Sequence, residues 1–287
     1  MIFKDKLRQL IRKSNSNLVV GLDTDLEKIP EIFRNEKFPL YKFNEMVILA
    51  TKDYCLGYKI NLAFYEAQGL EGLKSLEKTM KFISGLKLTI CDAKRGDIGN
   101  TSKQYAKSIF NNLNFDAVTL SPYMGTDSIE AFLTNKSKFA YILVRTSNRS
   151  ADEIQNLKSG NKRVYEIVAK IMLKRFGNQI GFVIGANHVN DVARFSSFKP
   201  QIPLLIPGIG TQSNNLKNLI RNVKNTMFVI NASRSVIYAG KKKSTYDEYF
   251  ESVKNSAESL NTEINKLKTK VWNLIPGKTG NQIRDYR

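Results

Sequence analysis

At 287 residues, of which 42% are hydrophobic, the chain is long enough for one large domain or two small ones with a well-filled core. It has no run of about eighteen apolar residues, which excludes a membrane-spanning helix and argues against a membrane partner. The net charge of +19 suits nucleic-acid binding, but the lysines are spread along the chain and only 241–243 form a tight run. We therefore expect an anionic small molecule, rather than nucleic acid, as the partner.

The N-terminal stretch MIFKDKLRQLIRKSNSN is basic and amphipathic, as transit peptides are. Its Asp5 and its direct continuation into the apolar LVVGLD favour a short helix of the fold instead. Further along, short β-rich apolar runs recur at regular intervals. We predict strands at 17–22, 54–60, 86–91, 116–120, 140–144, 180–185, 202–206 and 226–230.

Amphipathic helix patterns separate most of these strands, for example at 71–84, 101–113 and 163–176, and a long apolar stripe begins at Tyr246 and ends at Val271. Strands that alternate with helices imply a parallel sheet. Eight such units in a chain of this length predict an α/β fold, a closed (β/α)8 TIM barrel. An open doubly wound sheet is the alternative, but it predicts a glycine fingerprint after the first strand, where the sequence reads GLDTDLEKIP.

No Pro-, Gly- or Ser-rich linker divides the chain, which predicts a single domain. We place that barrel domain at 1–275 and a short C-terminal tail at 276–287.

Polar side chains follow every predicted strand at the same end, where barrels of this class gather their chemistry. In strand order they are Asp23 and Asp25, Lys59 and Asn61, Asp92 and Lys94, then 121–125, 145–148, 186–188, 207–212 and 231–234. The glycine-spaced PGIGTQ after the seventh strand, with Ser233 and Arg234 after the eighth, predicts a phosphate site, since backbone N–H groups and an arginine fork both bind phosphate. An ordinary tight turn with a surface arginine is the alternative.

The densest charge cluster is in LTICDAKRGDIGNTS, residues 88–102. Asp92 and Lys94 are two residues apart at a strand end, so both should point inward, beside Lys59 of the neighbouring strand, while Arg95 turns away. Asp97 falls in the following loop, where capping of the next helix is the plain alternative. Burying several charges is costly unless they are paired, and a barrel does not need them for stability, so we interpret the cluster as a catalytic site rather than a structural ion-pair network.

The two cysteines, Cys55 and Cys91, lie inside apolar strands, which favours small core residues over a disulfide or a metal pair and suggests a reducing, cytoplasmic compartment. The single histidine, His188, excludes a histidine-cluster metal site, and we expect it to be incidental to the chemistry.

Segments along nearly the whole chain resemble the orotidine 5′-phosphate decarboxylase family, in particular its somewhat longer bacterial-type branch. They are GLDTD (21–25), YKINLAFYEAQG (58–69), DAKRGDIGNT (92–101), TLSPYMGTDSIEAF (119–132), VRTSN (144–148), GFVIGA (181–186), PLLIPGIGTQ (203–212) and NASRSVIYA (231–239). The resemblance implies conversion of orotidine 5′-monophosphate to uridine 5′-monophosphate, the last step of de novo pyrimidine nucleotide synthesis, without a cofactor or a metal.

The resemblance also implies a role for each matching residue. Lys59, Asp92, Lys94 and Asp97 would form an alternating charged array, in which Lys94 protonates C6 of the pyrimidine and Asp92 faces the substrate carboxylate. In this family the last aspartate comes from the partner subunit of a homodimer, so Asp97, Ile98 and Thr101 would complete the opposite site. Asp23 would bind the ribose, Ser147 and Pro207 would contact the base, and Gln212, Ser233 and Arg234 would hold the phosphate.

The sequence departs from the family pattern in the loops. Arg149 and Ser150 stand where Pro-Gly is usual, Ser213 and Asn214 stand in place of a glycine pair, and Ser233 replaces a frequent glycine. Two other functions remain open: a barrel sugar-phosphate decarboxylase or aldolase that uses a divalent metal with a similar Asp-Lys-Asp set, and a catalytically silent nucleotide- or RNA-binding barrel.

Overall fold

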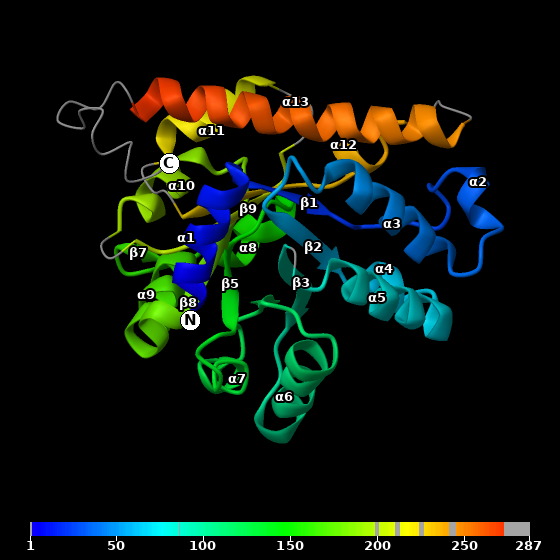
Figure 1. Ribbon diagram of the computed structural model, residues 1–287. Helices are drawn as coiled ribbons and strands as arrows, with labels where there is room; N and C mark the ends of the chain where they lie inside the picture. The colour runs from blue at the N-terminus through cyan, green and yellow to red at the C-terminus, as the bar shows by residue number, and fades with distance from the viewer. Residues whose placement is uncertain are drawn as a thin grey trace.

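The computed structural model describes residues 2–85, 87–198, 201–209, 213–223, 227–240 and 245–272. Within these residues eight parallel strands close into a barrel (Figure 1), in the order β1, β10, β9, β8, β5, β4, β3, β2. The barrel strands are β1 (Leu18–Gly21), β2 (Gly57–Asn61), β3 (Leu88–Arg95), β4 (Ala117–Leu120), β5 (Phe139–Arg145), β8 (Ile180–Ile184), β9 (Leu204–Pro207) and β10 (Phe228–Ala232). The predicted fold class and all eight predicted strands are confirmed.

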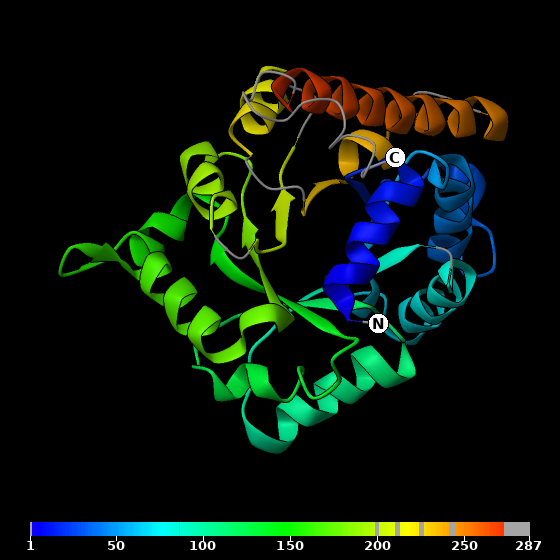
Figure 2. The ribbon, with the colours of Figure 1, turned by 60° about the vertical axis from the view of Figure 1, so that its left-hand side comes forward.

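Helices surround the barrel (Figure 2). They are α1 (Phe3–Ser14), α2 (Glu31–Arg34), α3 (Pro39–Thr51), α4 (Ala63–Glu66), α5 (Gly69–Ile83), α6 (Gly99–Ala106), α7 (Asp127–Glu130), α8 (Asp152–Gln155), α9 (Val164–Phe176), α10 (Val189–Ser196), α11 (Ser213–Asn222), α12 (Arg234–Ile237) and α13 (Tyr246–Trp272). Short turns of other helix types are η1 (Lys107–Asn112), η2 (Arg149–Ala151) and η3 (Gly177–Gln179). The long α13 lies along one side of the barrel against α3, α11 and α12 (Figure 1).

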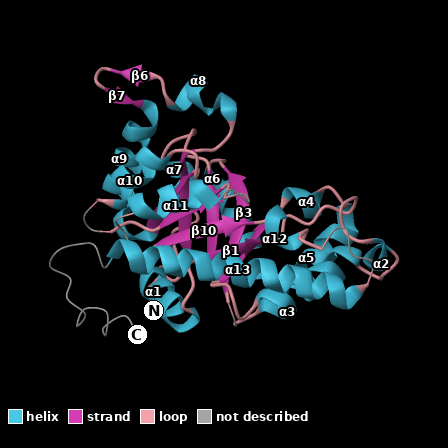
Figure 3. Ribbon diagram, turned by 90° about the horizontal axis from the view of Figure 1, so that it is seen from above, coloured by secondary structure: helices cyan, strands magenta, loops and turns pink. Residues whose placement is uncertain are grey.

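The helix predictions are confirmed, but the structure differs from the sequence analysis in one helix and in one unpredicted hairpin. The predicted helix at 101–113 is α6 followed by a wider π-helical turn, η1. After β5 the chain forms a small antiparallel hairpin, β6 (Lys158–Ser159) with β7 (Lys162–Arg163), which projects from the body of the molecule (Figure 3). The hairpin was not predicted, because its strands are short and fully polar and so carry no apolar alternation.

In the half of the barrel where the strands begin, the interior is filled by apolar side chains from alternate strand positions, including Val19, Ile90 and Val229. Helix α1 closes this end: Phe3 and Leu7 are buried, and the ring of Phe3 stacks on Phe139 at the start of β5 with ring centroids 4.2 Å apart. The basic N-terminal segment is therefore a helix of the fold. Since one end is plugged, any ligand must enter from the end where the strands finish.

At the carboxyl ends of the strands the interior positions become polar. Lys59, Asp92, Thr119 and Asn231 all lie on the inner face and are at most 9% exposed. This polar layer lies next to the apolar layer inside the barrel. The fold therefore places charged side chains at the end of the barrel where the strands finish. Cys55 and Cys91 are both buried and unbonded, which confirms that they are core residues. No helix in the described part of the chain is both long and apolar enough to cross a bilayer.

Candidate active site

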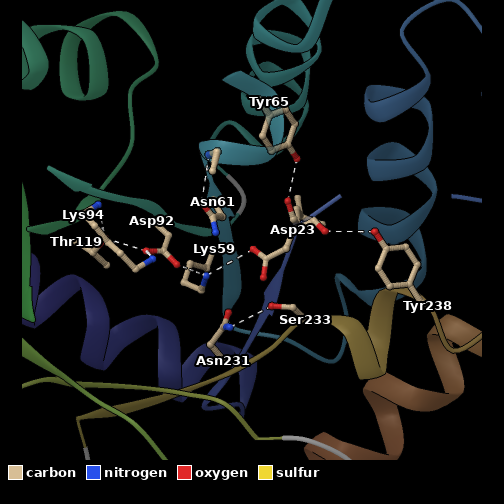
Figure 4. A network of polar contacts seen from close by, with 12 residues as sticks. Asp23, Lys59, Asn61, Tyr65, Asp92, Lys94, Thr119, Asn231, Ser233 and Tyr238 are labelled. Atoms are coloured by element: carbon tan, nitrogen blue, oxygen red, sulfur yellow. Dashed lines mark hydrogen bonds and ion pairs between the residues drawn. The ribbon is translucent and has the colours of Figure 1, made fainter. Parts of the chain in front are cut away.

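A row of alternating charges crosses the carboxyl end of the barrel from β1 to β3 (Figure 4). Asp23 lies 3.7 Å from Lys59 Nζ through its Oδ1. Lys59 Nζ donates to Asp92 Oδ2 at 2.6 Å, and Lys94 Nζ donates to Asp92 Oδ1 at 2.6 Å. Each carboxylate oxygen of Asp92 therefore faces its own ammonium group. The prediction that Lys59, Asp92 and Lys94 come together is confirmed by these contacts.

The electrostatics of the row keep its two central members, Lys59 and Asp92, charged. Burial alone would lower the pKa of Lys59, but the carboxylates of Asp23 and Asp92 outweigh it and raise the pKa above its ordinary value. Burial would likewise raise the pKa of Asp92, but Lys59 and Lys94 bring it down to about 2. The opposite charges thus offset the cost of burial for one another.

Lys94 differs from the other members of the row in exposure and backbone shape. Its side chain is 50% exposed, against 4% for Lys59 and 11% for Asp92, so its ammonium group lies at the mouth of the site. Its φ of +48° lies in the left-handed region, where a lysine is strained. Positions held in such conformations cluster at functional sites. Arg95, the next residue, turns away as predicted, pairing with Glu66 and lying over the ring of Tyr105.

Asp97 does not join the row within one chain. Its carboxylate accepts a hydrogen bond from the N–H of Ile98 at 2.8 Å, and α6 begins without a side-chain cap, so the capping alternative does not apply either. Ile98 is 51% exposed, and Thr101 is exposed on the first turn of α6. Asp97 is half-buried, and Ile98 and Thr101 are the exposed residues of this segment, which directly follows Lys94 and Arg95 in the chain.

Hydrogen bonds fix the backbone on both sides of Asp23. Tyr238 donates from its hydroxyl to the carbonyl of Asp23 at 3.3 Å and accepts from the N–H of Asp25 at 2.8 Å. Tyr65, fully buried, donates to the carbonyl of Leu22 at 3.0 Å. Asp23 Oδ1 itself is buried without a hydrogen-bond partner among the described residues, so it can accept one from a ligand. Asp25, by contrast, turns outward to Lys28.

The region after β10 meets β1 closely. A Cβ placed on Gly21 would lie 1.9 Å from Ser233 Oγ, so only glycine fits there. Ser233 accepts a hydrogen bond from Asn231 Nδ2 at 3.2 Å, and Arg234 begins α12 with its side chain exposed. Gln212 lies outside the described residues, as do the side chains of Ser213 and Asn214.

The loop after β5 approaches the loop after β9. A Cβ on Gly208, the residue after Pro207, would lie 3.8 Å from the Cβ of Ser147, so Ser147 and the end of β9 are neighbours at the mouth of the barrel. Arg149 and Ser150, where the family pattern has Pro-Gly, form the short turn η2. His188 contacts the carbonyl of Thr146 through Nε2 at 3.0 Å and so supports this loop.

Of two further polar residues of the site, Thr119 was not singled out from the sequence, and Asn231 was included only as the first residue of the polar stretch 231–234. Threonine is common in strands, so Thr119 carried no signal. Asn231 did carry one, because asparagine is depleted in strands and this one sits inside an apolar run. Among the described residues no group of three or more His, Cys, Asp or Glu side chains is arranged to hold a metal ion.

A separate cavity of about 420 Å³ lies at the other end of the barrel, near the starts of β3 and β4, lined in part by Lys6, Thr89 and Asp116. Lys6 and Asp116 already form an ion pair there. The charged row, and not this cavity, is therefore the candidate active site.

Comparison with known proteins gives a consistent result. Residues 16–249 match the model of the orotidine 5'-phosphate decarboxylase / HUMPS family. Orotidine 5'-phosphate decarboxylase of Christiangramia forsetii is 44% identical over 241 residues, which cover 82% of this chain and 88% of the relative. The enzyme of the same name from Dehalococcoides mccartyi is 41% identical over 273 residues, covering 92% and 98%.

Solved structures agree with these relatives. The OMP decarboxylase of Leishmania donovani superposes with a TM-score of 0.79 at 31% identity, covering 94% of this chain and 99% of that one. A structure from Toxoplasma gondii, titled as a putative orotidine-monophosphate decarboxylase, gives a TM-score of 0.83 at 26% identity, with coverage of 94% and 98%.

Proposed function

The chain belongs to the orotidine 5′-phosphate decarboxylase family, and on that premise we propose how its charged row converts orotidine 5′-monophosphate to uridine 5′-monophosphate. The reaction is a carboxy-lyase step of pyrimidine synthesis. The observation that carries the proposal is the placement of Asp92 between two ammonium groups, each 2.6 Å from one of its oxygens. Such a fixed set of charges can act on a substrate without rearranging.

The chemistry needs this kind of electrostatic help. When the bond from C6 to the carboxylate breaks, CO₂ leaves and the electron pair remains on C6, where the pyrimidine ring offers no delocalisation. Lys94 Nζ then donates a proton to C6, giving uridine 5′-monophosphate, and solvent returns a proton to the lysine. A preorganised cation lowers the barrier because it stabilises the charge as it develops. Asp92, facing the substrate carboxylate, adds repulsion that departure of CO₂ relieves.

Lys59 and Asp23 support this centre. Lys59 is 3% exposed and held by two carboxylates, so we assign it to fixing Asp92 in place. Asp23 Oδ1 is buried and lacks a hydrogen-bond donor among the described residues. A ribose hydroxyl would satisfy it, which fits the proposed ribose contact.

We assign the remaining substrate contacts, those of the phosphate and the base, to the loops at the carboxyl end of the barrel. We place the phosphate at Ser233 and Arg234, after β10, together with Gln212, which lies outside the described residues. We place the base between Ser147 and Pro207, whose loops are adjacent. Arg149, Ser213 and Ser233 depart from the family pattern in these loops, so their effect should be on substrate affinity and not on the charged row. The +19 net charge favours capture of this substrate, which carries both a phosphate and a carboxylate.

We propose further that the enzyme is a homodimer with shared active sites, in which Asp97, Ile98 and Thr101 serve the opposite protomer. In support, large apolar side chains are exposed in the segments after β2, β3 and β4: Leu70 at 76%, Ile98 at 51%, Tyr123 at 85% and Met124 at 48%. Consecutive segments that each expose large apolar side chains are suited to an interface. A second copy covering them would bring its Asp97 to the first copy's row.

Residues 1–275 are proposed as one catalytic domain and 276–287 as a tail, which lies outside the described residues. The two buried free thiols fit a reducing cytoplasm as the place of action.

The test is to follow the loss of orotidine 5′-monophosphate absorbance with and without a strong chelator. Turnover that the chelator leaves unchanged supports the proposal. Turnover that the chelator abolishes would favour the metal-dependent alternative, and an absence of turnover would defeat the proposal itself.

A further inference from the structure

Thr119, at the end of β4, lies between the two residues that carry the proposed chemistry. Its hydroxyl donates to Asp92 Oδ1 at 3.0 Å and accepts from the backbone N–H of Lys94 at 3.1 Å (Figure 4). We propose that Thr119 is a positioning residue for the decarboxylation, holding the side chain of Asp92 and the backbone of Lys94 in register with each other. The inference rests on the proposed function of the row.

The backbone of β3 explains why such a residue is needed. Cys91 pairs with Val118 and Arg95 pairs with Leu120, so four steps along β3 oppose two steps along β4. The segment between, from Asp92 to Lys94, therefore bulges out of the ladder. Bulges redirect side chains and leave backbone groups without their usual partners.

Lys94 shows the consequence of this bulge. Its φ of +48° is a conformation that a lysine adopts only when its surroundings impose it. Its N–H donates to the hydroxyl of Thr119 in place of a strand carbonyl. The regular pattern resumes where the N–H of Ser121 donates to the backbone carbonyl of Arg95 at 2.8 Å. Thr119 is thus the link that holds the strained residue to the neighbouring strand.

The direction of both hydrogen bonds is fixed by chemistry. A backbone N–H can only donate and an ionised carboxylate can only accept, so the hydroxyl must accept from Lys94 and use its single proton for Asp92. Thr119 is 1% exposed, which leaves no room for water to take over. Asp92 Oδ1 then has two donors, Thr119 and the ammonium of Lys94, and the carboxylate cannot rotate without losing both.

The described chain contains a matched control in the same pair of strands. Thr89, at the other end of the barrel and 5% exposed, donates from its hydroxyl to Asp116 Oδ2 at 3.3 Å and accepts from the N–H of Asp116 at 3.1 Å. It makes the same two kinds of hydrogen bond away from the charged row. Thr119→Val and Thr89→Val therefore remove equivalent bonds, and only the first should alter the chemistry.

The experiment compares wild type, Thr119→Val, Thr119→Ser and Thr89→Val in kcat, KM, binding of uridine 5′-monophosphate and urea unfolding. Thr119→Val should lose roughly tenfold to hundredfold in kcat while KM and product binding change less than about threefold. Thr119→Ser, which keeps the hydroxyl, should recover to within about threefold of wild type. Thr89→Val should lose stability with little loss of kcat.

Equal losses of kcat in Thr119→Val and Thr89→Val, or equal losses in Thr119→Val and Thr119→Ser, would overturn the inference. A crystal structure of Thr119→Val gives a reading that does not depend on activity: Lys94 should leave the left-handed region, and an unmoved Lys94 and Asp92 would also overturn it. Failure of the proposed function is distinguishable, because it would appear as absent turnover in wild type.

Discussion

The ammonium group of Lys59 lies 2.6 Å from Oδ2 of Asp92, and both residues are nearly closed off from solvent, at 3% and 9% exposure. The pair is the centre of a row that runs from Asp23 through Lys59 and Asp92 to Lys94. Because every inner member of the row has opposite charges on both sides, the removal of one member leaves its neighbours uncompensated. The effects of substitutions here should therefore be large and not additive.

Replacing Asp92 with asparagine should lower the free energy of unfolding at neutral pH. In acid, the difference between the variant and wild type should disappear. Burial would raise the pKa of Asp92, but Lys59 and Lys94 lower it to about 2 from its ordinary 3.8. A group with a lowered folded-state pKa stabilises the fold above its unfolded pKa, and the contribution disappears as the pH falls through the folded value. We expect a difference in unfolding free energy of about 2 kcal/mol at pH 7 that narrows between about pH 5 and pH 2.

Urea unfolding of wild type and Asp92→Asn at a series of pH values measures this difference. Asp53→Asn, which changes an exposed carboxylate before β2, serves as the control and should change the unfolding free energy little at neutral pH. A difference between wild type and Asp92→Asn that stays constant from neutral to strongly acidic pH would contradict the assigned electrostatics.

Arg234→Ala should weaken phosphate recognition. A lost hydrogen bond to a doubly charged phosphate should raise KM about tenfold to hundredfold with a smaller effect on kcat. Steady-state kinetics with orotidine 5′-monophosphate measure this, and orotidine, which lacks the phosphate, should be turned over equally slowly by wild type and variant. Arg8→Ala, on α1, is the matched control. A variant whose KM equals that of wild type would show that Arg234 does not hold the phosphate.

Mixing Lys94→Ala and Asp97→Ala homodimers tests the shared site. Random exchange makes half of the dimers mixed, each with one intact site, so about a quarter of wild-type activity should return. Activity after mixing is compared with each variant alone, and subunit exchange is verified with differently tagged chains. If exchange is complete and activity does not return, Asp97 does not act across an interface.

Much of the fold was predictable because its strands are apolar and regularly spaced. The strand ends were less predictable. We expected β3 to stop at Cys91, where the apolar residues stop, but the strand continues through a bulge and pairs with β4 again at Arg95. Hydrophobicity reports burial and not hydrogen bonding, so a bulged and charged strand end is invisible to it.

The charged row was predictable because charged residues directly after a buried apolar strand are conspicuous in the sequence. Asp92 and Lys94 stand out because they follow a buried strand two residues apart, and their contact with each other and with Lys59 is observed. The left-handed backbone of Lys94 was not predictable, since lysine has no preference for it and a neighbouring strand imposes it. Thr119, which accounts for that backbone, looks like any other strand threonine.

The most direct test of the account is the activity of Lys94→Ala. Lys94 is half-exposed at the mouth of the site, so the variant should fold and bind uridine 5′-monophosphate, as circular dichroism and calorimetry would show. Its kcat for orotidine 5′-monophosphate should fall at least about a thousandfold, because it lacks both the proton donor and the cation that faces the developing charge. Lys81→Ala, on the surface of α5, should retain full activity. A folded Lys94→Ala variant with a kcat near that of wild type would contradict the central claim that Lys94 carries the reaction.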